Sequence, residues 1–490
     1  MAASGEEDFS EFSFCNFISL GSSAVGSAIE LLNPTSVMNC NFVNNVLDVK
    51  ARANYLSDFA NNNLDEIFII GNSLSETTTW PLADNNGFKY VIGGDQTIED
   101  MTTLTLEAGV CVEFRSNLQE FFVNGTLNAI GTETDSIYFK GNQNLRGGIR
   151  IANNGEVNES TFSYCVFDSL GASNLGNAAL EVFNPIVMDH CRFNTDRNIV
   201  ADADFISNIG STNRLVEIEL LSNSLDSTTV WPNADASGFT YRFLGDLTVE
   251  EGTTLEIAAG NTIKFPSVLV ELDVNGQLIA NGSISDSINF VGEVTGAGGI
   301  SIQAVGAIDT SMFSYCNFDS LGSTNVNTAL RVNQPILLSN STFNNTIDMI
   351  SDADFVWGLE ASNRLSQIQL LSGSLDSTTT WTNADDQGFE YFLLGDQFLD
   401  DGKILTIDPG VEITFSSPLQ EIVVDGQLIA EGTSTDSIKF TGAPIPAGGI
   451  YLRNNGEVDT SLISYCSFKN LSSFNVDAGL RLENLSLIHI

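Results

Sequence analysis

The sequence of this chain repeats with a long period of about 150 residues. A cysteine followed two residues later by phenylalanine returns at the same place in four successive copies, at Cys15, Cys165, Cys316 and Cys466. A long fixed period is typical of stacked or tandem units that pack only against their neighbours. An active site is usually one asymmetric cluster of side chains, so a feature found in every copy indicates scaffold rather than catalysis.

The copies also predict how the chain is divided. We expect solenoid units over residues 1–160, 161–310 and 311–460, with residues 461–490 beginning a fourth unit. The first residues match the interior of the next copy, and the last residues match the interior of the preceding one. We therefore expect the chain to be a piece of a longer protein, so the lack of a visible signal peptide carries little weight.

The charge of the chain limits its partners. Acidic residues number 62 and basic residues only 19, which gives a net charge of -43. Such a surface repels nucleic acid and anionic membranes, so we expect neither as a partner. No run of 18 apolar residues occurs, which argues against insertion into a membrane. A hydrophobic content of 42% is ordinary for a folded protein and argues against disorder.

A finer period divides each copy into coils. Phe265, Phe290, Phe318 and Phe343 follow one another at intervals of 25, 28 and 25 residues, and each ends a short segment of alternating polar and apolar residues. Such alternation is typical of half-buried strands. About 25 residues suffice for three short strands and three turns, so the pattern predicts one turn of a β-solenoid. The segment 352–396 fits this period less well and is either a lateral bulge or a junction between helices.

The alternation predicts which side chains face the interior. Lys264 must face water, so Ile263 and Phe265 on either side of it face inward. Equivalent residues on successive coils would then stack about 4.8 Å apart along the interior. By the same argument, an outward Asn317 places three neighbouring side chains inside: Ser314, Cys316 and Phe318.

Several segments carry a resemblance to a known family. Gly245–Val249 precedes Thr253–Ile257, and Asp425–Thr433 precedes Asp436–Gly442. The chain resembles the right-handed parallel β-helix repeats, of pectin-lyase-like type, found in large surface proteins of Bacteroidota. The resemblance implies an all-β, right-handed parallel β-helix with coils of about 25 residues, located outside the cell or at its surface. This superfold carries adhesins, stalks, lyases and hydrolases alike, so it does not decide the function.

We expect an extracellular, non-enzymatic stalk or adhesin that binds polysaccharide or a cell-envelope component. Unpaired strand edges at the ends of the solenoid would favour self-association. The alternative is a carbohydrate-active β-helix, similar to a polysaccharide lyase or glycoside hydrolase, whose catalytic coils are either weakly marked in this sequence or lie outside it. Hydrolysis needs clustered carboxylates, and the acidic pairs Asp202/Asp204 and Asp352/Asp354 recur between copies as turn residues do. No catalytic residue is therefore assigned.

Three tryptophans are the candidate ligand-binding residues. Trp80, Trp231 and Trp381 each follow a threonine-rich run, one per copy, and would form a ridge on which sugar rings stack. The alternative places each indole against the flank of the solenoid as a packing residue.

The cysteines and acidic residues decide whether covalent bonds or metals are expected. Cys15 and Cys40, like Cys165 and Cys191, would lie on neighbouring coils and form either disulfides or a ladder of free thiols. We favour the thiols, because Ser341 takes the second place in the next copy. No cofactor is expected, and no zinc motif occurs. Calcium remains a candidate ligand on charge alone, since no calcium-binding loop is present. Cys111 is predicted to be a lone surface thiol.

Overall fold

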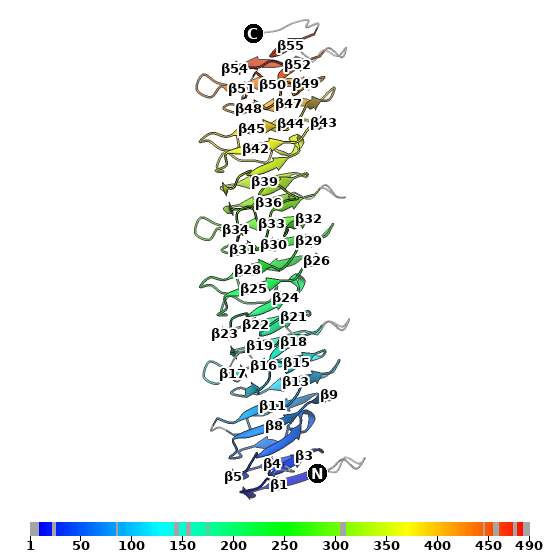
Figure 1. Cartoon of the computed structure of the whole chain (residues 1–490), viewed down its shortest axis with the longest axis vertical. Helices are drawn as coiled ribbons and strands as arrows, with labels where there is room; N and C mark the ends of the chain where they lie inside the picture. The colour runs from blue at the N-terminus through cyan, green and yellow to red at the C-terminus, as the bar shows by residue number, and fades with distance from the viewer. Residues whose placement is uncertain are drawn as a thin grey trace. The chain divides into compact units, whose positions relative to one another are not determined.

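A computed structural model describes most of the chain, and its secondary structure is almost entirely strand (Figure 1). The described residues are 9–21, 26–84, 87–141, 147–152, 158–173, 176–303, 310–443, 446–453, 460–473 and 478–483. Strands make up 48% of the structure and helices 2%, and the sheets are parallel throughout. The strands form a β-solenoid of about 17 turns in all, with about 25 residues per turn, which confirms the predicted fold class.

Contacts divide the chain into two compact units, and each has the same architecture. The first comprises residues 1–221 and 232–241, and the second comprises residues 222–231 and 242–490. This division does not follow the four units expected from the repeats, whose boundaries stay a prediction.

In the first unit, each complete coil contributes one strand to each of three parallel sheets. The first strands of the coils are β8 (Glu66–Ile70), β11 (Lys89–Ile92), β14 (Cys111–Phe114), β17 (Ile137–Gly141), β20 (Cys165–Asp168) and β23 (Arg192–Asn194). The second strands are β9 (Asn72–Leu74), β12 (Gln96–Ile98), β15 (Glu120–Val123), β18 (Gly148–Ile151), β21 (Leu180–Val182) and β24 (Ile199–Ala201). The third strands are β10 (Thr78–Trp80), β13 (Thr103–Leu106), β16 (Thr126–Ile130), β19 (Ser160–Ser163) and β22 (Ile186–Asp189). Earlier coils supply β1 (Ser10–Ser13), β2 (Asn16–Ile18), β3 (Ile29–Leu31), β4 (Thr35–Met38), β5 (Asn41–Val43), β6 (Val49–Arg52) and β7 (Phe59–Ala60).

The second unit repeats this arrangement through two further copies. Its first copy has the second strands β26 (Asn223–Leu225), β29 (Leu247–Val249), β32 (Leu272–Val274), β35 (Ile300–Ile302), β38 (Leu330–Val332) and β41 (Met349–Ser351). The third strands are β27 (Thr229–Trp231), β30 (Thr254–Ile257), β33 (Gln277–Asn281), β36 (Ser311–Ser314) and β39 (Ile336–Ser339), and the first strands include β31 (Thr262–Phe265), β34 (Ile288–Gly292), β37 (Cys316–Asp319) and β40 (Thr342–Asn344). The following copy has β42 (Gln367–Leu370), β43 (Gly373–Leu375), β44 (Thr379–Trp381), β45 (Glu390–Leu393), β46 (Gln397–Leu399), β47 (Ile404–Ile407), β48 (Glu412–Phe415), β49 (Glu421–Val424), β50 (Gln427–Glu431), β51 (Ile438–Gly442), β52 (Gly449–Leu452), β53 (Leu462–Ser464), β54 (Cys466–Lys469) and β55 (Leu480–Leu482).

The interior consists of ladders of equivalent side chains, as the alternation predicts. Ile263 and Phe265 are completely buried. Phe318 stacks on Phe290 and on Phe343 in the neighbouring coils, with ring centroids 5.2 Å and 4.4 Å apart. Each coil therefore buries its apolar side chains against the coils before and after it, and the hydrophobic effect holds the stack together.

The prediction that Ser314 faces the interior is wrong, although Cys316 and Phe318 are buried there. Tyr315 has a φ of 49°, in the left-handed region, and this bend separates β36 from β37. The two strands lie in different sheets, so the alternation does not continue across the bend. The Ser314 hydroxyl faces outward and donates to the Asn281 side chain at 3.0 Å.

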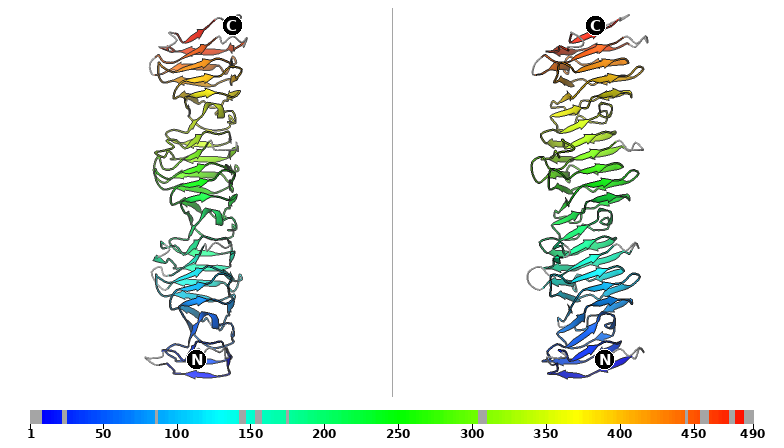
Figure 2. Two further views of the ribbon diagram at one scale, coloured as in Figure 1. Left: turned by 90° about the vertical axis from the view of Figure 1, so that its right-hand side faces the viewer. Right: turned by 45° about the vertical axis from the view of Figure 1, so that its right-hand side comes forward.

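The segments that fit the coil period poorly are unusually short coils. Each contains a single-turn 3-10 helix: η1 (Ala53–Tyr55), η3 (Ala203–Phe205) or η4 (Ala353–Phe355), where the chain leaves the regular stack of strands (Figure 2). We call these segments junctions. At the third junction Met349 pairs with Ile368, so one complete turn takes only 19 residues.

The junctions also change which strands share a sheet. The second strand of one copy pairs there with the first strand of the next copy: β6 with β8, β24 with β25 (Glu217–Leu220), and β41 with β42. A sheet that carries second strands before a junction therefore carries first strands after it.

Candidate functional site

The three recurring tryptophans lie in the interior at the junctions, so the predicted sugar-binding ridge is not formed. Trp80, Trp231 and Trp381 have no exposed surface, and a buried indole has no face on which a sugar ring can stack. The Trp80 Nε1 donates to the Ala53 carbonyl at 3.0 Å, and the Trp381 Nε1 donates to Ala353 at 3.1 Å.

The indoles are therefore structural anchors of the junctions. Trp80 and Trp381 each donate to the carbonyl at the start of a 3-10 helix, which has few internal hydrogen bonds of its own. Beside Trp80, the buried Tyr90 ring lies 5.0 Å away, and its hydroxyl donates to the Pro81 carbonyl at 2.6 Å. Burial raises the pKa of Tyr90, so this hydroxyl remains a donor.

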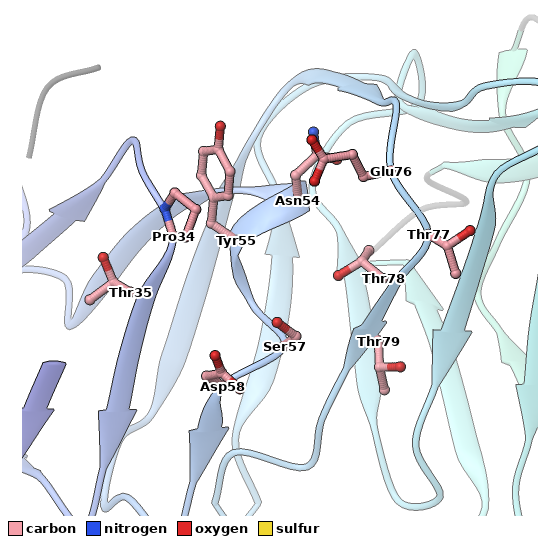
Figure 3. A pocket seen from close by; sticks show the side chains of 10 residues that line it. All are labelled: Pro34, Thr35, Asn54, Tyr55, Ser57, Asp58, Glu76, Thr77, Thr78 and Thr79. Atoms are coloured by element: carbon pink, nitrogen blue, oxygen red, sulfur yellow. The ribbon is translucent and has the colours of Figure 1, made fainter. Parts of the chain in front are cut away.

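The first junction contains a polar cavity of about 320 Å³ (Figure 3). Three segments line it: the start of β4, the turn around η1, and the run of hydroxyl side chains that leads into β10. The lining residues are Pro34, Thr35, Asn54, Tyr55, Ser57, Asp58, Glu76, Thr77, Thr78 and Thr79.

This cavity combines two carboxylates with the amide group of Asn54. Asp58 and Glu76 both line it, and the buried Asn54 Oδ1 accepts no hydrogen bond within the part of the chain that the structure describes. Gly358 and Ser377 stand at the places of Asp58 and Glu76 in the third junction, so the two acids are not copied there. A cavity lined by hydroxyl, amide and carboxylate groups suits a polar ligand rather than an apolar one.

The third junction instead carries a buried carboxylate. Asp354 is 6% exposed, and its carboxylate accepts hydrogen bonds from the Ser377 hydroxyl at 2.8 Å and from the Asp376 backbone N–H at 3.3 Å. Burial is the main cause that raises the pKa of Asp354 to about 6. Asp352 caps η4 by accepting from the Asp354 N–H at 3.0 Å, which confirms the interpretation of this acidic pair as turn residues.

All seven cysteines are free thiols, as the favoured interpretation predicts. The Cys165 Sγ donates to the Ala129 carbonyl at 3.2 Å and the Cys191 Sγ to the Phe162 carbonyl at 3.4 Å, and burial raises the pKa of Cys165. Cys111 lies on the outward side of β14 but is half-buried, which also raises its pKa.

The sequence prediction missed a fourth tryptophan, Trp357, which has no counterpart in the other copies. It stands where the earlier copies have Ser57 and Ser207, and its side chain is 44% exposed. The signal in the sequence was this break in the repeat, because a residue present in one copy is not needed for the shared scaffold. Trp357 is the exposed indole among the four, since the other three are fully buried.

Within the described ranges, no group of three or more His, Cys, Asp or Glu side chains is placed to hold a metal ion. No helix of these ranges has the length and apolar character needed to cross a membrane. His190 is at the surface and stacks on Tyr164, with ring centroids 4.4 Å apart.

The fold alone defines the class of this protein, because comparisons with known proteins give no match. No protein-family model, curated protein or solved structure matches it. The structure defines a parallel β-solenoid built from copies of about 150 residues.

Proposed function

We propose that the chain is an extracellular, non-enzymatic stalk or adhesin of a cell-surface protein, with polysaccharide or another cell-envelope component as its partner. One observation carries this proposal: the copies keep their inward side chains and change their outward ones. On β13, β30 and β47 the inward residues are Leu104, Leu255 and Leu405, whereas the outward ones are Thr105, Glu256 and Thr406. On β16, β33 and β50 the inward residues are Leu127, Leu278 and Leu428, whereas the outward ones are Asn128, Ile279 and Ile429.

This pattern is expected of a scaffold that displays a variable surface. Inward residues are fixed by packing against neighbouring coils, while outward residues are free to serve different contacts. The kinship with pectin-lyase-like surface proteins of Bacteroidota is part of the proposal and supports a location outside the cell. The net charge of -43 favours an uncharged partner over an anionic one.

The test combines binding with turnover. Purified protein is incubated with insoluble and soluble polysaccharides, both uncharged and acidic, and with isolated cell envelopes. Binding is measured by co-sedimentation, and cleavage by the appearance of reducing ends or unsaturated uronic acids. We expect binding without cleavage, and cleavage of any polysaccharide would refute the non-enzymatic proposal.

The first-junction cavity supports the carbohydrate-active enzyme as a second candidate. Glycoside hydrolysis uses a pair of carboxylates, and Asp58 and Glu76 line one cavity among hydroxyl groups. If reducing ends appear in the assay above, the Asp58→Asn and Glu76→Gln variants should abolish them. Cleavage that survives both substitutions would remove this cavity as the active site.

A further inference from the structure

A row of apolar side chains crosses the outer surface of the second unit and ends near Trp357. Register pairs align Val230, Glu256, Ile279, Met312 and Leu337 on the neighbouring strands β27, β30, β33, β36 and β39. All five residues alternate with buried ones and point outward, and Val230 and Leu337 are 39% and 41% exposed. Four of the five are apolar, although they face solvent.

On the next coil, the row meets Gly358, the residue that follows Trp357. Leu338 pairs with Leu359, which aligns Leu337 with Gly358. A Cβ atom at Gly358 would lie 3.1 Å from the Leu337 Cδ2, so the backbone next to Trp357 lies against the end of the row. The backbone that carries the exposed indole therefore lies beside the end of this stripe, which spans five strands, roughly 19 Å at the usual strand spacing, and is apolar except at Glu256.

Polar side chains border the stripe on both sides. On one side, the Thr254 hydroxyl donates to the Gln277 amide oxygen at 3.2 Å. On the other side, the register aligns Asn281 with Ser314 and Ser314 with Ser339. The surface thus offers apolar contacts along its centre, and hydroxyl and amide groups along its edges.

The equivalent row in the preceding copy is different. It consists of Thr79, Thr105, Asn128, Thr161 and Val187, of which four are polar. Because both rows lie on the same kind of sheet, the scaffold does not require apolar residues there. The uninterrupted apolar part, Ile279, Met312 and Leu337, has polar edges and marks a binding surface rather than a packing need.

We propose that this stripe and Trp357 bind an uncharged polysaccharide, an inference that rests on the proposed polysaccharide-binding function. A sugar ring has two apolar faces of C–H groups and an edge of hydroxyl groups. The faces fit the aliphatic row and the indole, and the hydroxyl edges fit Gln277 and Asn281. The length of the stripe exceeds one sugar ring and therefore suits a polymer. The acidic surface of the chain repels charged polysaccharides such as polyuronates.

Tryptophan fluorescence of the full chain tests this proposal, because the other three indoles are fully buried. Acrylamide, a neutral quencher, should act mainly on Trp357. The chain is titrated with soluble uncharged glucans, mannans and galactans, and with polygalacturonate as the charged control. We expect one or more uncharged polymers to protect Trp357 from acrylamide, and polygalacturonate to leave it unprotected.

Two variants copy residues that the chain already tolerates elsewhere. Trp357→Ser introduces the serine found at the equivalent positions Ser57 and Ser207. Met312→Thr introduces the threonine found at the equivalent position Thr161. Each should weaken binding of the protecting polymer at least tenfold, while Thr161→Met in the preceding copy should leave it unchanged. If a polysaccharide binds equally well to all variants, the stripe is not the site, but the proposed function stands. If no polysaccharide binds at all, both proposals of polysaccharide binding fail. Concentration-dependent association that Trp357→Ser abolishes would make a second copy of the chain the occupant and overturn the proposal.

Discussion

A buried serine–glutamate hydrogen bond provides the sharpest test of how the coils are held together. Glu271, which directly precedes β32, is 6% exposed, and its side chain accepts a hydrogen bond from the buried Ser323 hydroxyl. The Glu271 backbone N–H also donates to Asp246 at 3.0 Å. Ser473 makes the same contact to Glu421 in the following copy. The bond therefore links coils that are about 50 residues apart in the sequence.

The preceding copy lacks this serine. Ala172 stands at the equivalent place, and the buried Glu120 Oε1 has no hydrogen-bond partner within the described part of the chain. The chain thus contains its own natural variant of the contact. A hydrogen bond to a charged group contributes about 1.5–3 kcal/mol to stability, and leaving a charged acceptor buried without a partner costs a similar amount.

We therefore expect Ser323→Ala to lower the stability of its coil by about 2 kcal/mol, because the Glu271 carboxylate stays buried without its donor. Ala172→Ser should raise the stability of its own coil by about 1 kcal/mol, because it supplies the missing donor to Glu120. A long solenoid does not unfold in one step, so a local measurement is needed. Hydrogen exchange of peptides covering β32 and β15 reports the two coils separately, and 2 kcal/mol corresponds to roughly thirtyfold faster exchange.

Glu271→Gln provides the control. In that background Ser323→Ala should cost clearly less, because no charge is then left buried. Equal costs in both backgrounds would refute the charged hydrogen bond as the source of the effect. Slower exchange in Ser323→Ala, or faster exchange in Ala172→Ser, would refute the reasoning altogether.

Three further predictions concern single positions. Burial raises the pKa of Asp354 from 3.8 to about 6, so this group favours folding below pH 4, and its contribution is lost as the pH rises through 6. Asp354→Asn, which copies Asn54 of the first junction, should therefore raise stability at pH 8 by about 1–2 kcal/mol and have little effect at pH 4, as thermal melts at both pH values would show. An added Cβ at Gly298 would lie 2.2 Å from the Phe265 ring, so Gly298→Ala should lower the free energy of unfolding by denaturant by about 3 kcal/mol. Gly252 also has a positive φ, but no atom lies within 4 Å of an added Cβ there, so Gly252→Ala should lower it by only about 1 kcal/mol. A thiol reagent at pH 8 should label at most three cysteines in the folded chain: Cys15, Cys111 and Cys466. It should label the buried thiols only after unfolding: Cys40, Cys165, Cys191 and Cys316. Rapid labelling of Cys165 in the folded chain would contradict its burial.

The repeated alternation was sufficient to predict the coil and most of its interior. Ile263 and Phe265 are inward because each flanks a lysine that must reach water, and this depends only on the period of a strand. The αL bend at Tyr315 was not predictable in this way, because tyrosine rarely adopts a positive φ. One bend moved Ser314 from the interior to the surface.

The amino-acid pattern alone was enough to predict the solenoid, its coil length, and the separation of most inward residues from outward ones. These follow from the period of two within a strand and from the copies at about 150 residues, which are local or strictly repeated signals. The burial of the repeated tryptophans and the exposure of Trp357 required the folded structure, because a side chain next to a junction is placed by coils distant in the sequence. The same stacking decided that second strands pair with first strands at each junction. Which parallel strands pair depends on the number of residues between one strand and its partner in the next coil. No local sequence pattern contains that number.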